Sequence, residues 1–151
     1  MPISRGLQRL FELRGLEEEL SQAALEEALS KLRVLEKELD AARERERNGR
    51  RRVTASAASA DMADRIAGLE ETRSASRRAA VLKPRIAEME AEVAERRAAF
   101  LAKRIERRQA ETLIGKTEAA EAIMAGRREQ REIDDWFLRG GRCADRAVEK
   151  S

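Results

Sequence analysis

The stretch ALSKLRVLEKELDAA at residues 28–42 decides the fold. Its apolar residues recur at alternating steps of four and three, at Ala28, Leu32, Leu35, Leu39 and Ala42. This is the heptad spacing of a helix whose apolar stripe packs against a partner helix. The stretch therefore predicts a coiled coil.

Apolar residues continue this series toward the N-terminus, at Leu13, Leu16, Leu20 and Ala24, with a stutter of two successive steps of four around Ala24. Because no proline interrupts residues 4–47, we expect one long helix there. The composition changes over the following residues, 48–60.

Asn48-Gly49 is a plausible helix stop, and Ser, Thr and Ala dominate the residues after it. We expect a turn region at 48–60, with Asp61 as the N-cap of the next helix. The alternative is a helix that continues through this segment, since Ala and Ser tolerate helical structure.

A second helical pattern covers residues 62–138, with its apolar series weakest around Arg73 and Ser76. Pro84 should kink or split this helix because it removes a backbone hydrogen bond. Gly140-Gly141 predicts the end of the helix, and residues 139–151 are expected to form a flexible tail.

Two helices of unequal length predict an all-α antiparallel coiled-coil hairpin that spans residues 1–151. At 1.5 Å per residue, the helices would be about 65 Å and about 115 Å long. A turn at 48–60 would place Leu7 opposite residue 101. The last 35 or so residues of the second helix would then have no partner within the chain.

Composition excludes several classes of function. The chain has 151 residues, 32 Lys and Arg against 29 Asp and Glu, 40% charged residues and no His. An imidazole base, a His-ligated metal and a Ser-His-Asp triad are therefore ruled out. A single Cys, Cys143, excludes an intrachain disulfide and a thiolate zinc site. We expect no cofactor and no bound metal.

The apolar residues nowhere form a run long enough to cross a bilayer, and the first residues do not resemble a secretory signal. The chain is therefore expected to be cytoplasmic, with no direct membrane insertion.

Catalysis is not expected either. Ile-Gly-Lys-Thr at 114–117 resembles the end of a phosphate-binding P-loop, but Ala110 stands where the motif needs Gly, and the flanks are helical. Asp134 and Asp135 are adjacent, so on a helix they point in different directions and cannot form an acid/base pair. The sequence predicts a protein that is not an enzyme.

A basic cluster is expected at the tip of the hairpin. It consists of Arg43, Arg45, Arg47, Arg50, Arg51 and Arg52. It could be a solvated turn that resists aggregation, or a surface that docks to an acidic protein through Arg-carboxylate contacts. Glu44, Glu46 and the Asn48-Gly49 break argue against nucleic-acid binding.

The segment RREQREIDDWF at 127–137 is the most distinctive part of the chain. It holds the only Trp, Trp136, next to Phe137 in a chain with 3% aromatic residues. The pair could anchor a protein interface. It could also pack against the start of the first helix, at Leu7, Leu10 and Phe11.

This segment resembles a signature near the C-terminus of FliJ-family proteins, which are the flagellar relatives of the YscO-type injectisome proteins. The matching residues are Gln130, Ile133, Asp134, Asp135 and Trp136. The layout is also similar, with a shorter first helix, a turn and a longer second helix. Only the last 30 or so residues carry a motif; the rest is a general heptad pattern.

The resemblance implies a non-enzymatic part of a type III protein export apparatus, similar to the central stalk of a rotary ATPase. Both chain ends would sit in the pore of the hexameric export ATPase, and the tip side would contact the cytoplasmic domain of the export-gate membrane protein. Some members escort empty export chaperones. The expected location is the cytoplasm, peripheral to the inner-membrane apparatus.

Carried over by position, the ATPase end comprises Gln130, Ile133, Asp134, Asp135 and Trp136, and adjoining Phe137 is added to it. The gate end comprises Glu38, Ala42 and Arg45, with Gly49 at a further matching position. Flagellar members often have aromatic residues there, and this chain has none. That departure favours an injectisome homologue. The alternative to the whole interpretation is a structural or adaptor coiled coil that self-associates through residues 105–138.

Overall fold

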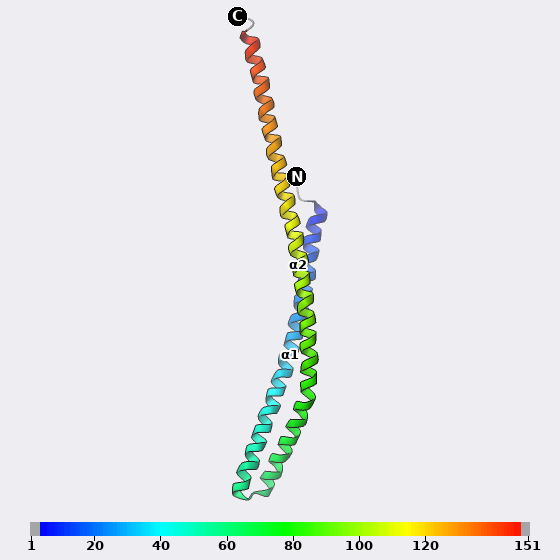
Figure 1. The fold of residues 1–151 in the computed structure, drawn as a ribbon, viewed down its shortest axis with the longest axis vertical. Coiled ribbons are helices and arrows are strands. Elements are labelled where there is room, and N and C mark those ends of the chain that lie inside the picture. The colour runs from blue at the N-terminus through cyan, green and yellow to red at the C-terminus, as the bar shows by residue number, and fades with distance from the viewer. Residues whose placement is uncertain (1–3, 149–151) are drawn as a thin grey trace. The chain divides into compact units, whose positions relative to one another are not determined.

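The fold consists of two helices joined by a two-residue turn. The computed structural model describes residues 4–148, and the side chains of residues 4–140. Helix α1 is Arg5–Ser59 and helix α2 is Met62–Val148. The two helices run antiparallel, and Figure 1 shows them side by side in the hairpin between Glu17 and Arg104. The predicted all-α hairpin with a longer second helix is confirmed.

The turn lies at Ala60 and Asp61. Ala60 has a φ of 57°, the left-handed conformation that commonly ends a helix. This conformation costs about 1–2 kcal/mol for a residue with a Cβ. Asp61 then caps α2, because its Oδ1 accepts a hydrogen bond from the Asp64 amide at 3.1 Å. The predicted N-cap is therefore confirmed.

The predicted turn region at 48–60 is wrong, because α1 continues through it to Ser59. Asn48 and Gly49 are both helical. Gly49 is buried against α2. This packing outweighs the about 1 kcal/mol by which glycine disfavours a helix relative to alanine. Farther along, the Ser56 hydroxyl is satisfied within the helix by donating to the Val53 carbonyl at 2.9 Å.

Helix α2 also extends beyond its predicted bounds. It passes through Pro84 without ending, so Pro84 does not split it. Pro84 is exposed, as is Ala80, whose carbonyl would have accepted the missing hydrogen bond and can be hydrated instead. The predicted end at residue 138 is wrong. No described glycine has a positive φ, and α2 continues through Gly140 to Val148. Of the predicted tail, residues 149–151 lie outside the described chain.

The chain divides into two compact units. One is the hairpin Glu17–Arg104, and the other joins the residues up to Leu16 with those from Ile105 onward. The core of the Glu17–Arg104 unit is a cluster of five buried residues, with Leu32 and Leu35 packed against it. The cluster comprises Leu39, Ala42, Ala79, Leu82 and Ile86.

The faces that α1 and α2 turn toward each other follow an unbroken seven-residue spacing, without the predicted stutter. On α1 the most buried of these positions are Ala28, Ala42, Gly49 and Ser56. Polar residues occupy other positions of the same series, among them Arg14 and Ser21, which are half-buried. Leu13, Leu16 and Leu20 lie outside the series and are exposed, Leu20 by 72%. They begin an apolar pattern in the sequence but do not belong to the helix contact.

Ion pairs between the helices define the register. In the Glu17–Arg104 unit, Glu17 pairs with Lys103 at 3.6 Å, and Glu38 pairs with Arg78 at 2.6 Å. In the other unit Arg14 pairs with Glu106 at 2.6 Å. Ion pairs that remain accessible to solvent, as these do, contribute only about 0–1 kcal/mol each, so they select the alignment more than they stabilise it.

The register differs from the prediction because the turn comes later in the chain. Counting antiparallel from the Arg14–Glu106 pair, Leu7 faces residue 113 and not residue 101. The unpaired part of α2 begins near residue 117. All side chains from residue 122 to residue 140 are exposed.

Gly49 and Gly68 allow a close approach of the two helices. A Cβ on Gly49 would lie 2.8 Å from the Gly68 carbonyl oxygen and 2.9 Å from the Thr72 nitrogen, both backbone atoms that cannot turn aside. A Cβ on Gly68 would lie 2.8 Å from the Gly49 carbonyl oxygen. The helices must therefore separate to admit any larger residue.

We predict that Gly49→Ala destabilises the hairpin by about 1–3 kcal/mol, although alanine is the better helix former. The matched control is Gly115→Ala, because nothing lies within 4 Å of the added Cβ. That variant should gain up to about 1 kcal/mol from helix propensity. Thermal unfolding followed by circular dichroism measures both. Stabilisation by Gly49→Ala would contradict the close contact.

Two exposed glutamates have a lowered pKa. A hydrogen bond from Arg47, and then its charge, lowers the pKa of Glu44, and Lys31 does the same to the pKa of Glu27. A lowered folded-state pKa means that each pair contributes stability above the ordinary glutamate pKa. That contribution is lost as pH falls through the folded value.

We predict that Arg47→Gln raises the pKa of Glu44 toward its ordinary value, as measured by NMR titration of the carboxyl group. Arg50→Gln is the control because Arg50 pairs with Glu46. A Glu44 pKa that is ordinary in the unaltered protein, or unmoved by Arg47→Gln, would show that the pair does not form in solution.

Candidate protein-binding surfaces

The last part of α2 is an exposed single helix that carries large apolar side chains. Trp136 is 69% exposed and Phe137 is 65% exposed. Their rings touch edge to face, with centroids 5.1 Å apart and planes at 79°. Further exposed apolar residues on the same segment are Ile123, Met124, Ile133 and Leu138. Such a surface has the aromatic and aliphatic character of an interface anchor.

The predicted packing of this aromatic pair against Leu7, Leu10 and Phe11 is wrong. Leu7 faces residue 113, which lies 23 positions before Trp136 and so about 35 Å away along α2. Leu7 and Phe11 are half-buried near Ala110 instead, and Ala110 itself is buried. The aromatic pair therefore remains available to another molecule.

The structure groups most of the predicted ATPase-end residues. Ile133 and Trp136 lie on one side of α2 and line a shallow hollow of about 380 Å³ together with Glu129 and Glu132. The Gln130 side chain donates a hydrogen bond to Asp134 at 2.9 Å. Asp135 lies on the far side of the helix from Ile133 because two positions on an α-helix are about 200° apart.

The predicted gate-end residues do not form one surface. Ala42 is 1% exposed and belongs to the core, so a partner cannot reach it while the hairpin is closed. Gly49 is buried in the same helix contact. Glu38 is half-buried and ion-paired with Arg78 at 2.6 Å. Of these residues only Arg45 is exposed.

The basic cluster does not lie at the turn, as the sequence predicted, but farther back along α1. Its members are also separated. Arg47 pairs with Glu44 on its own helix, and Arg52 reaches across to Asp64 at 2.8 Å and Glu71 at 3.3 Å. These two carboxylates raise the pKa of Arg52, chiefly through the hydrogen bond with Asp64.

Sequence reasoning missed a groove where arginines from both helices meet. It has a volume of about 500 Å³. Its lining comprises Glu46 and Arg50 from α1, and Thr72, Arg73, Ser76, Arg77 and Ala80 from α2. The groove could not be predicted from the sequence, because a turn at 48–60 would pair these residues with a different part of the other helix.

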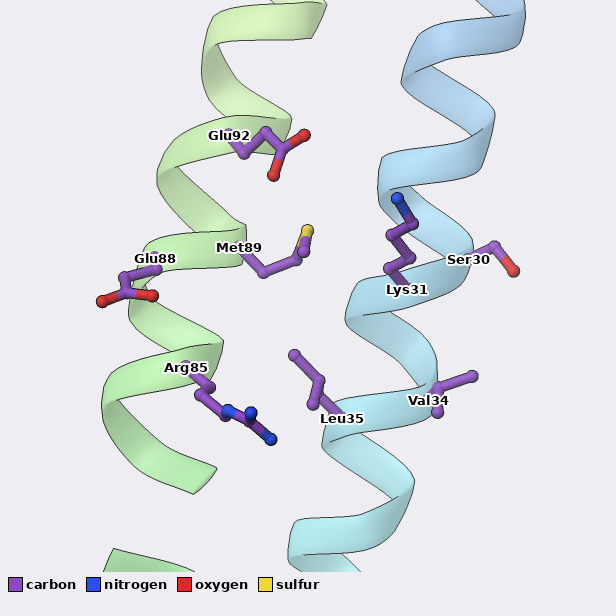
Figure 2. Close-up of a pocket in the computed structure, with 8 residues that line it drawn as sticks. All are labelled: Ser30, Lys31, Val34, Leu35, Arg85, Glu88, Met89 and Glu92. Carbon is purple, nitrogen blue, oxygen red and sulfur yellow. The ribbon is translucent and has the colours of Figure 1, made fainter. Parts of the chain in front are cut away.

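A second groove lies between the helices farther from the turn, with a volume of about 480 Å³. Figure 2 shows Leu35 of α1 and Met89 of α2 pointing into the gap, with Lys31 and Glu92 on one side of them and Arg85 on the other. Ser30 and Val34 point away from α2. This groove has an apolar floor and a rim of mixed charge, and no sequence motif marks it.

The remaining candidate sites have no catalytic or ligand-binding geometry. The P-loop resemblance at 114–117 is continuous helix, and the Thr117 hydroxyl donates to the Leu113 carbonyl at 2.8 Å. Within the described chain, no three His, Cys, Asp or Glu residues gather into a possible metal site. In that same part of the chain, neither helix has a segment of the length and hydropathy that crossing a membrane requires.

Comparison with known proteins supports the sequence resemblance. Residues 4–142 match the family model FliJ, described as the flagellar FliJ protein. The match covers both helices and ends beyond the aromatic pair. The matching model is the flagellar one, so it lends no support to the expected injectisome homologue. Searches of the curated proteins and of the solved structures returned no match.

A family match over residues 4–142 is a statement about nearly the whole helical chain, including the hairpin and the exposed end of α2. The motif behind the sequence resemblance lies within about the last 30 residues, whereas the family match spans residues 4–142. The chain therefore belongs to the FliJ family, whose members are non-enzymatic stalk proteins of the type III export apparatus.

Proposed function

We propose that this protein is a coiled-coil stalk and escort that binds the hexameric export ATPase through the exposed end of α2. The single observation that carries the proposal is an exposed aromatic pair, Trp136 and Phe137, on the part of α2 that has no partner helix among the described residues. An exposed patch of this kind in a highly charged chain marks a binding surface. FliJ-family membership supplies the export apparatus as its setting.

The contact would be formed by Ile133, Trp136 and Phe137, with Gln130, Asp134 and Asp135 as its polar border. The apolar rings would supply the desolvated centre of the interface, and the polar residues would limit where the helix can dock. A partner that binds only the assembled ring shifts the ATPase toward its hexamer by mass action. No chemistry of the stalk itself is needed.

The opposite end of the hairpin would link the ATPase to the cytoplasmic domain of the export-gate membrane protein. Arg45 is the predicted gate-end residue whose exposure fits such a contact, while Ala42 and Glu38 would act by holding the hairpin together. Escort of empty export chaperones is part of the same proposal. The protein would then work in the cytoplasm, peripheral to the inner membrane.

Trp136→Ala with Phe137→Ala should abolish the stimulation of ATP hydrolysis and hexamer formation that the unaltered protein produces with its cognate ATPase. ATPase turnover and analytical ultracentrifugation measure the two effects. The matched control replaces Met62 and Ile66 by alanine, since both are exposed apolar residues near the turn. That variant should stimulate normally. An unaltered protein that changes neither quantity would refute the proposed function.

Self-association through residues 105–138 is the competing function, because the same exposed helix could bind a second copy. The sole Trp distinguishes the two. In the free protein we expect acrylamide to quench Trp136 emission freely at every protein concentration, and the ATPase to protect it. If raising the protein concentration alone protects Trp136, the self-associating coiled coil is the better account.

A further inference from the structure

The arginine-lined groove near the turn is flanked by an excess of positive charge. Residues 43–78 contain ten Arg and no Lys against six Asp and Glu, a formal charge of +4. The whole chain has a formal charge of only +3. The positive charge of the protein is therefore concentrated in this part of the hairpin.

The two flanks of the hairpin differ in how that charge is compensated. On the flank opposite the groove, ion pairs between the helices neutralise the arginines: Glu38 with Arg78, and Asp64 and Glu71 with Arg52. These pairs use the carboxylates of one helix to hold the arginines of the other. Arg45, which is seven residues after Glu38 and therefore on the same flank, is exposed and stays outside these pairs.

On the groove flank the arginines are compensated only locally. Arg50 pairs with Glu46 at 2.6 Å and Arg73 with Glu70 at 3.5 Å, each on its own helix, and both arginine side chains remain about 70% exposed. Arg77 has no carboxylate partner among residues 4–140. Exposed pairs of this kind contribute little and exchange readily for a better partner.

We propose that Arg50, Arg73 and Arg77 form a docking surface for an acidic segment of a partner protein. Guanidinium groups bind carboxylates through two parallel hydrogen bonds, and the Ser76 hydroxyl in the same groove can donate another. The groove is a shallow, open hollow of about 500 Å³ between the helices, so side chains of an extended or helical segment can lie against it.

Glu46 in the groove and Glu70 beside it favour a protein over other anionic partners. A uniformly negative surface, such as a phospholipid bilayer or a phosphodiester backbone, would be repelled by these two carboxylates. An acidic segment with spaced carboxylates can place each one against an arginine and avoid both glutamates. The absence of Lys in residues 43–78 agrees with recognition by paired hydrogen bonds more than by point charges.

This inference rests on the proposed function only in taking the turn end of the hairpin to be free while the ATPase holds the end of α2. The docking surface consists of Arg50 from α1 and of Arg73, Ser76 and Arg77 from α2, and it is separate from Glu38, Ala42 and Arg45.

The test measures binding of a fluorescently labelled peptide of alternating Glu and Ser by anisotropy, using the full-length protein. Arg50→Gln with Arg73→Gln and Arg77→Gln should weaken the affinity about tenfold or more. A matched control replaces Arg33, Arg97 and Arg108, three exposed arginines elsewhere, by Gln. The control should change the affinity by less than about twofold. Circular dichroism confirms that both variants remain helical.

Two further variants separate the contribution of paired hydrogen bonds to peptide affinity from that of positive charge. Replacement of the three groove arginines by Lys should lose part of the affinity, because the charge remains but the paired hydrogen bonds do not. Ser76→Glu should weaken binding by placing a carboxylate in the groove.

Equal losses in the groove and control variants would overturn the proposal, as would an unaltered protein that ignores the peptide. Binding to phosphatidylserine vesicles without binding to the peptide would also overturn it and would identify a membrane surface. The groove variant should still bind the export ATPase. Failure of the unaltered protein to bind the ATPase would refute the proposed function and leave the peptide result standing.

Discussion

The approach of two backbones at Gly49 and Gly68 is the constraint on which the hairpin depends. An antiparallel pair of helices can come this close only where both contribute small residues, and α1 supplies Ala42, Gly49 and Ser56 at intervals of seven. The contact keeps α1 helical through a glycine that would otherwise favour its end. It thereby moves the turn to Ala60 and fixes which residues of α2 are paired and which are left over.

Local sequence predicted the type of fold but not its register. The heptad at 28–42 and the absence of proline from residues 4–47 require a helix with a partner, and the Asp61 cap is a purely local signal. The helix stop predicted at Asn48-Gly49 is wrong because helix propensity describes an isolated helix, whereas Gly49 packs against another helix. Leu13, Leu16 and Leu20 have helical spacing although they are exposed. Their spacing therefore did not identify the face of α1 that packs against α2.

The candidate surfaces were predictable to different degrees. The exposed end of α2 follows from a helix longer than its partner, and its aromatic pair is conspicuous in a chain with 3% aromatic residues. The groove of Arg50, Arg73 and Arg77 could not be found without the register, because its residues come from both helices. The same register removes Ala42 from the surface. A stalk of this kind can bind one partner at an exposed helix and another near its turn without any catalytic group.

Hydrogen exchange with and without the cognate ATPase tests the central claim most directly, because it reports the pairing of every segment in one experiment. The free protein should exchange fast over residues 122–140 and slowly over the core that contains Leu39, Ala42 and Leu82. The ATPase should slow exchange in residues 122–140 and leave residues 43–78 unchanged. Slow exchange of residues 122–140 in the free monomer, or protection that appears only in residues 43–78, would contradict the account.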